Sequence, residues 1–185
     1  MAKKKEKRPF KGENINVFTD DYTVVDIETT GLSPEFEEII EIGAIRVREG
    51  KETERFSELI KPEKAISPFI TNLTGISNEM VQNAREAKEV LSDFREFLGD
   101  DVIVGHNVNF DVDFLYDHCA KRELAPLSNN YIDTLKVSRR VLTSLHHHRL
   151  SDLAEYYSVS YEGAHRAVND CAITNCCYRR LFDRE

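Results

Sequence analysis

The sequence predicts an α/β domain in which a mixed β-sheet is flanked by helices. Three strand-like segments follow one another before Pro62, and strand and helix patterns then alternate as far as a long closing helix. Strands in series followed by alternating strands and helices indicate a mixed sheet. The chain has 185 residues, which suffice for one domain with a full core and leave little for a second.

The opening strands are expected at residues 22–27, 39–47 and 54–60. Residues 22–27 are apolar on both alternating faces until the first carboxylates appear, as in a central strand that is covered on both sides. Residues 48–51, with the sequence Arg-Glu-Gly-Lys, separate the second and third strands and suit a hairpin turn. We therefore expect three consecutive strands to open the fold.

The rest of the domain is predicted to alternate between helices and short strands. Apolar residues recur at helical spacing from Val90 to Leu98, Gly99 stands where that helix would end, and Ser77 is suited to cap a turn through Met80. The remaining strands are expected at residues 102–104 and 131–132, and the remaining helices at residues 107–122, 135–142, 149–157 and 167–182.

Composition and charge exclude some classes of protein. No run approaches the roughly 18 to 20 apolar residues of a membrane-spanning helix, and the N-terminus lacks the apolar segment of a secretory signal, so we expect a cytoplasmic protein with no membrane partner. The 25 Lys and Arg against 33 Asp and Glu give a net charge of −8, which argues against nucleic-acid binding by broad electrostatic attraction. An acidic protein can still act on nucleic acid where divalent metal ions supply local positive charge.

Residues 1–18 are expected to form a basic, flexible N-terminal arm ahead of a domain at residues 19–185. Residues 3–11 carry six basic side chains against one Glu and have no periodic apolar pattern. This composition favours a solvated terminus, and the alternative is a tail that grips phosphates.

Two conspicuous sets of residues are left outside the predicted chemistry. The four cysteines lack both an oxidising compartment and the spacing of a zinc site, because three of them fall in the last helix, so they are interpreted as buried thiols. The run His146-His147-His148 does not place three imidazoles on one helix face, which disfavours a zinc site there.

Four acidic side chains are predicted to point inward from three segments. Asp26 and Glu28 are two residues apart on a strand, so both leave the same face about 7 Å apart along the chain. Asp111 and Asp170 lie on the apolar stripes of their helices, where buried unpaired carboxylates are expensive. A bound cation would offset that cost, and hard oxygen ligands of this number suit one or two Mg²⁺ or Mn²⁺ ions.

His165 is a candidate general base. It precedes Asp170 by five residues, which on one regular helix would separate their directions by about 140°. To share a site with Asp170, His165 must stand at a loop-to-helix junction, and Gly163 suits such a loop. A histidine beside a metal cluster indicates a general base, and the alternative is a surface histidine.

Three segments in this order resemble the motifs of the DEDDh 3′–5′ exonucleases. They are residues 26–32 (DIETTGL), 106–111 (HNVNFD) and 165–170 (HRAVND), and the similarity runs from about Tyr22 to Phe182. The family includes the proofreading epsilon subunit of bacterial DNA polymerase III and the exonuclease domain of the polymerase C type. Residues 73–76 (LTGI) are most similar to the polymerase C type.

The resemblance implies a ribonuclease H-like fold and two-metal hydrolysis of phosphodiesters. By similarity, Asp26, Glu28, Asp111 and Asp170 bind two Mg²⁺ or Mn²⁺ ions, His165 takes a proton from the attacking water, and Thr30, Gly31, Leu32 and Phe110 contact the terminal nucleotide. Two further acids are left out of the metal set. Glu41 is interpreted as a residue that orients other groups, and Asp133 as the N-cap of the following helix.

The implied substrate is a nucleic acid with a free 3′ end, with single-stranded or frayed DNA preferred, and a DNA polymerase subunit is an expected partner. Trimming of RNA 3′ ends is an alternative, because the same motifs serve both substrates and recognition of a 2′-hydroxyl cannot be located from one sequence. A non-catalytic nucleic-acid or polymerase-binding module on the same fold is a second alternative. The presence of all five catalytic positions argues against that module.

Overall fold

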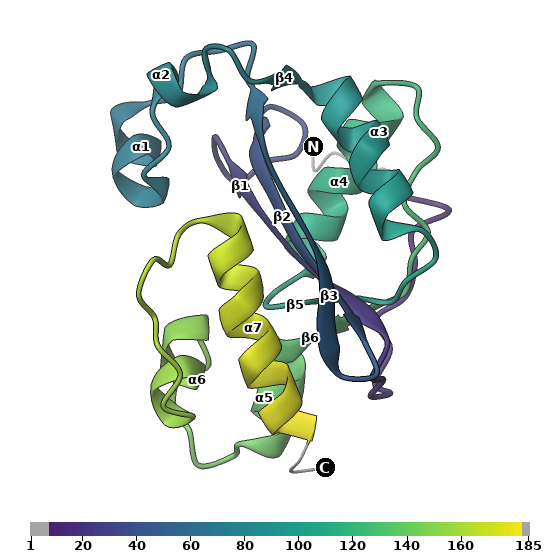
Figure 1. The fold of residues 1–185 in the computed structure, drawn as a ribbon, viewed down its shortest axis with the longest axis vertical. Coiled ribbons are helices and arrows are strands. Elements are labelled where there is room, and N and C mark those ends of the chain that lie inside the picture. The colour runs from purple at the N-terminus through teal and green to yellow at the C-terminus, as the bar shows by residue number, and fades with distance from the viewer. Residues whose placement is uncertain (1–7, 183–185) are drawn as a thin grey trace, which may run out of the picture.

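The computed structural model describes residues 8–182 and shows a six-stranded mixed sheet with helices on both faces (Figure 1). The strands lie side by side in the order β4-β3-β2-β1-β5-β6. Their bounds are β1 Tyr22–Thr29, β2 Ile39–Arg48, β3 Lys51–Lys61, β4 Arg85–Glu86, β5 Ile103–Gly105 and β6 Tyr131–Asp133. The predicted α/β class and the three opening strands are confirmed.

The first three strands form an antiparallel meander. β2 pairs with β1 on one side and with β3 on the other, and the tight β2–β3 turn places Glu49 and Gly50 at φ 50° and 69°. Glycine adopts this left-handed conformation without steric cost, which explains a turn at the predicted position. The β1–β2 register places Glu28 directly opposite Glu41.

β1 is an internal strand, as its apolar sequence predicts. It pairs antiparallel with β2 and parallel with β5, and β6 continues the sheet in parallel beyond β5. Helices must connect the parallel strands, because a parallel pair cannot be joined by a short turn. The acidic residues Asp26 and Glu28 therefore lie in the second half of a strand that has neighbours on both sides.

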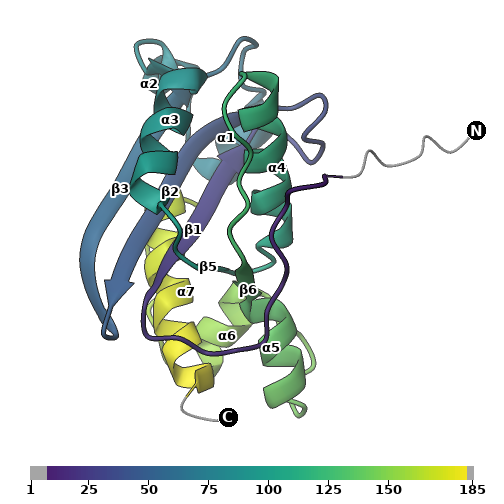
Figure 2. The same cartoon turned by 90° about the vertical axis from the view of Figure 1, so that its right-hand side faces the viewer.

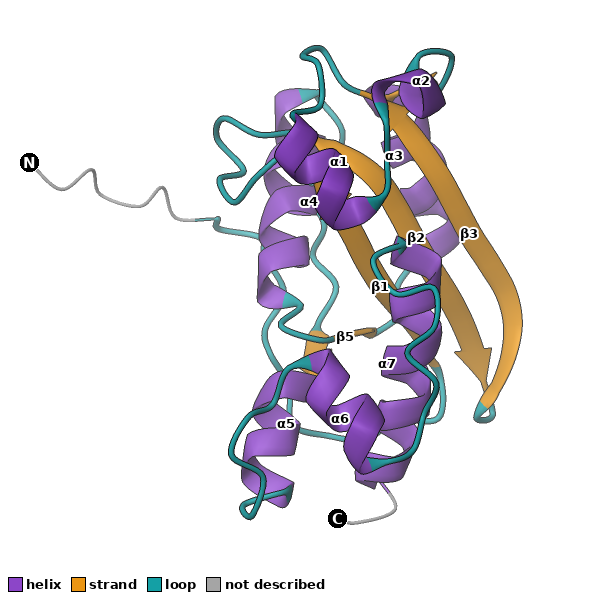
Figure 3. Cartoon of the chain, turned by 90° about the vertical axis from the view of Figure 1, so that its left-hand side faces the viewer, coloured by secondary structure: helices purple, strands orange, loops and turns teal. Residues whose placement is uncertain are grey.

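Helices cover the two faces of the sheet. α3 (Ala87–Leu98) and α4 (Asn109–Lys121) cover the face seen in Figure 2, where Val25 and Ile27 pack in a core with Phe94 and Phe114. α5 (Thr134–Val141), α6 (Leu150–Tyr156) and α7 (Ala167–Phe182) cover the opposite face, seen in Figure 3. There Val24 and Ile45 pack with Leu153, Cys171, Cys177 and Leu181.

Two short helices stand beyond the ends of β2 and β3. α2 (Asn78–Val81) begins after Ser77, whose hydroxyl accepts from the N–H of Met80, as predicted. α1 (Pro68–Thr74) is not among the predicted helices, although Ser67 caps its start and Gly75 ends it at φ 73°. Both helices pack through a small apolar cluster around Ile40.

Residues 8–18 differ from the flexible arm that the composition suggests, and residues 1–7 lie outside the described part of the chain. The Arg8 guanidinium contacts Asp117 of α4 through Nε and Nη2 at 2.7 and 2.6 Å. Lys11 bonds Asp113 at 2.5 Å, and Tyr131 of β6 exchanges backbone hydrogen bonds with Glu13 and Ile15. The acids on the outer face of α4 thus pair with the basic residues and hold this segment against the domain.

No helix among residues 8–182 has both the length and the apolar character needed to cross a membrane.

Candidate active site

Three carboxylates meet at the junction of β1 and α7. Asp26 and Glu28 leave the same face of β1, and Asp170 reaches them from the first turn of α7. One oxygen from each carboxylate lies within 4.8 Å of the others, which is close enough for all three to ligate one metal ion. Asp170 is only 8% exposed, and its Oδ1 is buried without a hydrogen-bond partner in the described part of the chain.

Asp111 lies beside this cluster on α4. It is 5% exposed, and its Oδ1 accepts a hydrogen bond of 3.1 Å from the N–H of Ile27, the residue between Asp26 and Glu28. Asp111 is not among the carboxylates that come within 4.8 Å of one another. The structure thus brings together three of the four predicted ligands and positions the fourth against the same strand.

The carboxylates repel one another and lie in a poorly solvated place. Burial, and next the charge of Asp111, raises the pKa of Asp26 well above its ordinary value. Burial also raises the pKa of Asp111 and of Asp170, and it raises the pKa of Glu28 to about 8 with help from the charges of Asp170 and Glu41. A cation bound among these groups would reverse the effect, because an opposite charge favours the ionised form.

His165 stands at the loop-to-helix junction, as predicted. It precedes α7 and has φ 66°, two residues after Gly163 at φ 75°. Its backbone N–H points to Asp170 Oδ2 at 3.3 Å, and its exposed ring lies edge-on to Tyr161 with the centroids 6.3 Å apart. His165 is thus exposed to solvent, and its backbone contacts a carboxylate of the cluster.

Glu41 is a buried acid whose role the sequence left open. It lies opposite Glu28 on β2, is 1% exposed, and accepts from Arg166 Nη2 at 2.6 Å and from Nε at 3.0 Å. Its Oε2 also accepts the N–H of Ala167 at 2.9 Å. Asp133 caps α5 as predicted, since its Oδ1 accepts from the N–H of Leu135, and it also accepts from the N–H of Asn107.

The four predicted substrate-contact residues lie on the loop after β1 and on α4. Thr30 Oγ1 donates to Glu37 and accepts from the N–H of Glu38, which closes the loop. Gly31 lies against the Glu37 side chain, which would have to shift if a Cβ were added, since that Cβ would lie 2.8 Å from it. The loop presents Leu32 to solvent with 86% of its surface exposed.

A cleft of about 930 Å³ separates this loop from α4. Leu32 and Phe110 both line it, with Asn107, Lys121 and Arg8 among the other lining residues. Phe110 packs on Phe114 with the ring centroids 4.8 Å apart, so it serves the core and faces the cleft. The structure thus brings two of the predicted contact residues to one open cleft.

The other marked histidines and cysteines stand apart from the carboxylates. His148 Nδ1 contacts Ser138 Oγ at 3.1 Å, and no histidine or cysteine of the described residues belongs to a metal-binding group with Asp26, Glu28 and Asp170. Cys119, Cys171 and Cys177 are buried free thiols, as interpreted, whereas Cys176 is exposed.

The family model described as Exonuclease (RNase_T) matches residues 23–176, which include the carboxylate cluster, Asp111 and His165. The chain belongs to this exonuclease family. The predicted resemblance is thereby confirmed at the level of the family.

Relatives of this exonuclease include much longer proteins. The chain is 42% identical over 161 residues to the PolC-type DNA polymerase III of Latilactobacillus sakei. It is 36% identical over 169 residues to the PolC-type DNA polymerase III of Oceanobacillus iheyensis. These matches cover 87% and 91% of the chain but only 11% and 12% of the relatives. The chain thus spans about a ninth of the length of the curated relatives that it matches.

Solved structures share the fold of this exonuclease. Exonuclease X in complex with 5′ overhanging duplex DNA has a TM-score of 0.69 at 25% identity, covering 88% of this chain and 91% of that one. Escherichia coli exonuclease I in complex with a dT13 oligonucleotide has a TM-score of 0.80 at 20% identity, covering 90% and 42%. The second similarity supports the fold alone.

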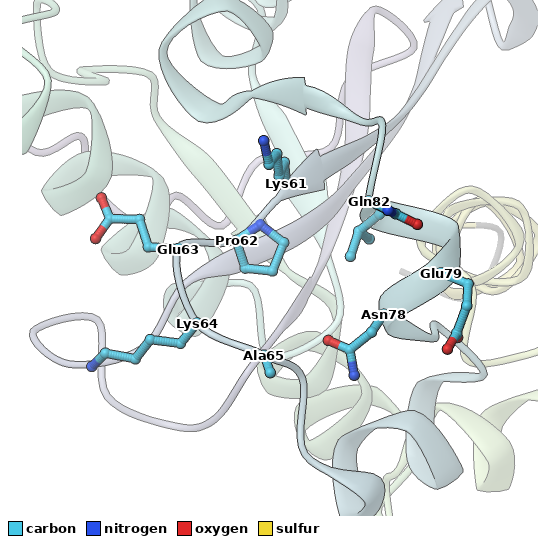
Figure 4. A pocket seen from close by; sticks show the side chains of 9 residues that line it. Lys61, Pro62, Glu63, Lys64, Ala65, Asn78, Glu79 and Gln82 are labelled. Atoms are coloured by element: carbon cyan, nitrogen blue, oxygen red, sulfur yellow. The ribbon is translucent and has the colours of Figure 1, made fainter.

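A smaller pocket of the exonuclease lies away from the carboxylates. It measures about 300 Å³ between the segment after β3 and α2, and the side chains of Lys61, Glu63 and Asn78 surround it (Figure 4). None of the predicted site residues lines it.

Proposed function

We propose that this exonuclease domain removes nucleotides one at a time from the 3′ ends of single-stranded or frayed DNA. The observation that carries the proposal is the cluster of Asp26, Glu28 and Asp170, three carboxylates within 4.8 Å of one another in a domain that also has an open cleft. Carboxylates that are clustered and largely withdrawn from water repel one another and are costly to keep without a partner of opposite charge. A cation-dependent reaction at this place explains why the fold retains them.

The donor set fits a hard divalent cation. All candidate ligands are carboxylate oxygens, the donors that suit Mg²⁺ and Mn²⁺. Asp170 Oδ1 is buried without a hydrogen-bond partner in the described part of the chain and belongs to a side chain of the cluster, so it lacks the partner that a cation would supply. We assign Asp26, Glu28, Asp111 and Asp170 as the ligands of two such ions. When bound, the ions stabilise charge on the attacking and leaving oxygens of the phosphodiester.

His165 is the proposed general base. The residue is exposed, its backbone bonds Asp170, and its ring takes a proton from the water that attacks phosphorus. The new P–O bond forms as the bond to the 3′ oxygen of the preceding nucleotide breaks, and that oxygen takes a proton from solvent. The products are a nucleoside 5′-monophosphate and a shortened strand with a free 3′-hydroxyl. The carboxylate of Asp170, which accepts from the His165 backbone, keeps base and cluster next to each other.

The cleft supports a substrate with an unpaired end. Leu32 and Phe110 line it from the loop and from α4, and a base that stacks between two such side chains cannot stay paired. Thr30 and Gly31 shape the loop that carries Leu32. The polymerase relatives favour DNA over RNA and a proofreading role within a replicative polymerase.

The experiment is digestion of a 5′-labelled single strand with Mg²⁺ or Mn²⁺. We expect a ladder that shortens from the 3′ end with mononucleotide 5′-phosphates as the product. Asp26→Asn, which removes charge but keeps shape, is the control for contaminating nuclease. Cutting of closed circular single strands would contradict an exonuclease, and a higher rate on a matched RNA strand would favour 3′ trimming of RNA.

A further inference from the structure

Glu41 and Arg166 form a forked ion pair at the start of the last helix. The carboxylate of Glu41 is buried, and Arg166 donates to both of its oxygens, from Nη2 to Oε1 at 2.6 Å and from Nε to Oε2 at 3.2 Å. The same carboxylate accepts the backbone N–H of Ala167 at 2.9 Å. One side chain of β2 therefore holds both the side chain and the backbone at the point where the His165 loop becomes α7.

A second contact fixes the same turn. Gly43, two residues after Glu41 on β2, lies so close to α7 that a Cβ would fall 2.4 Å from the carbonyl carbon of Ala167 and the nitrogen of Val168. Contacts under 3.0 Å are essentially never seen for real Cβ atoms, so only glycine permits this approach. β2 and the first turn of α7 are thus in backbone contact.

The position of this turn determines the position of two site residues. Asp170 follows Arg166 by one helical turn, and its N–H donates to the Arg166 carbonyl at 3.0 Å. His165 immediately precedes Arg166 and bonds Asp170 through its backbone. A displacement of Arg166 would therefore move Asp170 away from Asp26 and Glu28 and would move the imidazole with it.

The ion pair also neutralises a negative charge next to the carboxylate cluster. Glu41 lies opposite Glu28 in the sheet, and its negative charge acts on Asp26, Glu28 and Asp170. Without Arg166, a fifth carboxylate would face the cluster and compete as a ligand. The guanidinium fork matches a carboxylate with two parallel hydrogen bonds, which a lysine ammonium cannot reproduce.

We infer that Glu41 and Arg166 are positioning residues that set Asp170 and His165 in the active site and keep Glu41 from binding metal. This inference rests on the proposed function, because it assigns the pair to the metal-binding arrangement. Neither residue is expected to touch the reacting phosphate. A purely structural pair would stabilise the fold without changing metal affinity.

The test compares Glu41→Gln and Arg166→Lys with the matched variant Arg48→Gln. In the Glu41→Gln variant the new amide nitrogen must replace either Oε1, which accepts from the guanidinium, or Oε2, which accepts from the guanidinium and the Ala167 N–H, so at least one hydrogen bond is lost. Arg166→Lys keeps the positive charge but loses the fork. Arg48 is on the same strand and pairs with Asp101 at 2.6 Å, and it belongs to no part of the site.

Mn²⁺ binding measured by calorimetry is the first readout, and digestion of DNA is the second. We expect Glu41→Gln to weaken Mn²⁺ binding and to lower kcat by about 10- to 100-fold, with little change in KM for DNA. The Mn²⁺ affinity and the kcat of Arg166→Lys should lie between those of Glu41→Gln and those of the wild type. Arg48→Gln should leave these quantities at the wild-type level, and melting temperatures show whether each variant is folded.

The outcomes separate this inference from the proposed function. If Glu41→Gln and Arg166→Lys bind Mn²⁺ as tightly as Arg48→Gln does, the inference is overturned and the proposed function stands. A wild-type chain that binds Mn²⁺ without degrading DNA would overturn the function, and calorimetry would still decide the inference. A wild-type chain that binds no Mn²⁺ would overturn both. Should Glu41→Gln not fold, Arg166→Lys carries the comparison.

Discussion

Asp111 Oδ1 accepts the backbone N–H of Ile27 at 3.1 Å, so a side chain of α4 is bonded to β1 between Asp26 and Glu28. The contact joins two segments that are 84 residues apart. The other carboxylate oxygen of Asp111, Oδ2, takes no part in this hydrogen bond. This hydrogen bond therefore fixes where Asp111 of α4 lies along β1, next to Asp26 and Glu28.

Removing one acid should stabilise the metal-free protein. Asp26 has its pKa raised by burial and by the charges of Asp111 and Asp170, so its ionised form is disfavoured in the fold. Asp26→Asn should raise Tm in chelator by about 2–4 °C, which corresponds to roughly 1 kcal/mol in a chain of this size. Scanning calorimetry with and without Mn²⁺ checks this. Mn²⁺ should stabilise the wild type and not the variant, and an equal response of both would contradict the assignment of Asp26 as a ligand.

Loss of the His165 imidazole should slow the chemical step. His165→Ala should lower the single-turnover rate by about two to four orders of magnitude and leave DNA affinity nearly unchanged. Fluorescence anisotropy in chelator measures the affinity separately. His147→Ala is the matched control, because it removes an imidazole outside the metal-binding group. A His165→Ala rate equal to the wild type at neutral and acidic pH would rule out His165 as the base.

Truncation of the two cleft side chains should weaken binding of the strand end. Leu32→Ala and Phe110→Ala should each raise KM by a factor equivalent to about 1–3 kcal/mol per stacked base, with little dependence on sequence. Phe36→Ala is the control, since Phe36 is 64% exposed on the same loop and does not line the cleft. Equal KM values for all three variants would show that the Leu32 and Phe110 side chains do not contact the strand end.

Stability should fall in acid because of His118. Burial and the charge of Arg122 lower the pKa of His118 to about 4, while Nε2 contacts the carbonyl of Glu37 at 3.0 Å. In the unfolded chain the imidazole takes up a proton near pH 6.5, whereas the folded chain does not until about pH 4. The unfolded state therefore binds more protons in this window, and the free energy of unfolding decreases by roughly 3 kcal/mol as pH falls through it.

The measurement for His118 is urea unfolding at pH 7 and pH 5. His118→Gln, whose amide can still donate to Glu37 and accept from Arg122, should lose less stability over this interval than the wild type. Parallel losses in both proteins would show that other groups determine the acid sensitivity.

The N-terminal segment should contribute to stability. Arg8→Gln breaks a half-buried fork to Asp117 and should cost about 1 kcal/mol in the free energy of unfolding. Arg85→Gln, which breaks the exposed pair with Asp93 at 2.7 Å, should have a smaller effect. Urea titrations of both variants make the comparison. An effect of Arg8→Gln no larger than that of Arg85→Gln would mean that this segment is only loosely attached.

The elements that the sequence predicts best are those whose signals are local. The apolar run of β1, the Gly50 turn and the helix ending at Gly99 each depend on residues within a few positions of one another. α1 had equally local signals, with Ser67 as cap, Pro68 in the first turn and Gly75 at the end, but its seven residues show no long apolar period. A short capped helix is thus recognised by its ends rather than by its periodicity.

The pairing partners of charged residues could not be predicted in the same way. Glu41 and Arg166 are 125 residues apart, and the only sequence signal was an acid inside an apolar strand. The bonds from Arg8 and Lys11 to α4 likewise span 98 to 109 residues, so the basic composition alone suggested an arm. The inward direction of Asp111 and Asp170 was predictable, because helical periodicity sets it, whereas the three-carboxylate contact depends on how α7 docks on the sheet.

The placement of Asp170 on the last helix has a consequence for biosynthesis. The cluster takes Asp26 from the first strand and Asp170 from a helix that begins at residue 167, so a chain emerging from the ribosome lacks the complete carboxylate cluster until that helix has been made and docked. On the proposed function, a nascent chain that has formed only its meander is expected to be inactive, because Asp170 is still missing from the cluster. The proposed site is therefore completed only when α7 has docked on the meander.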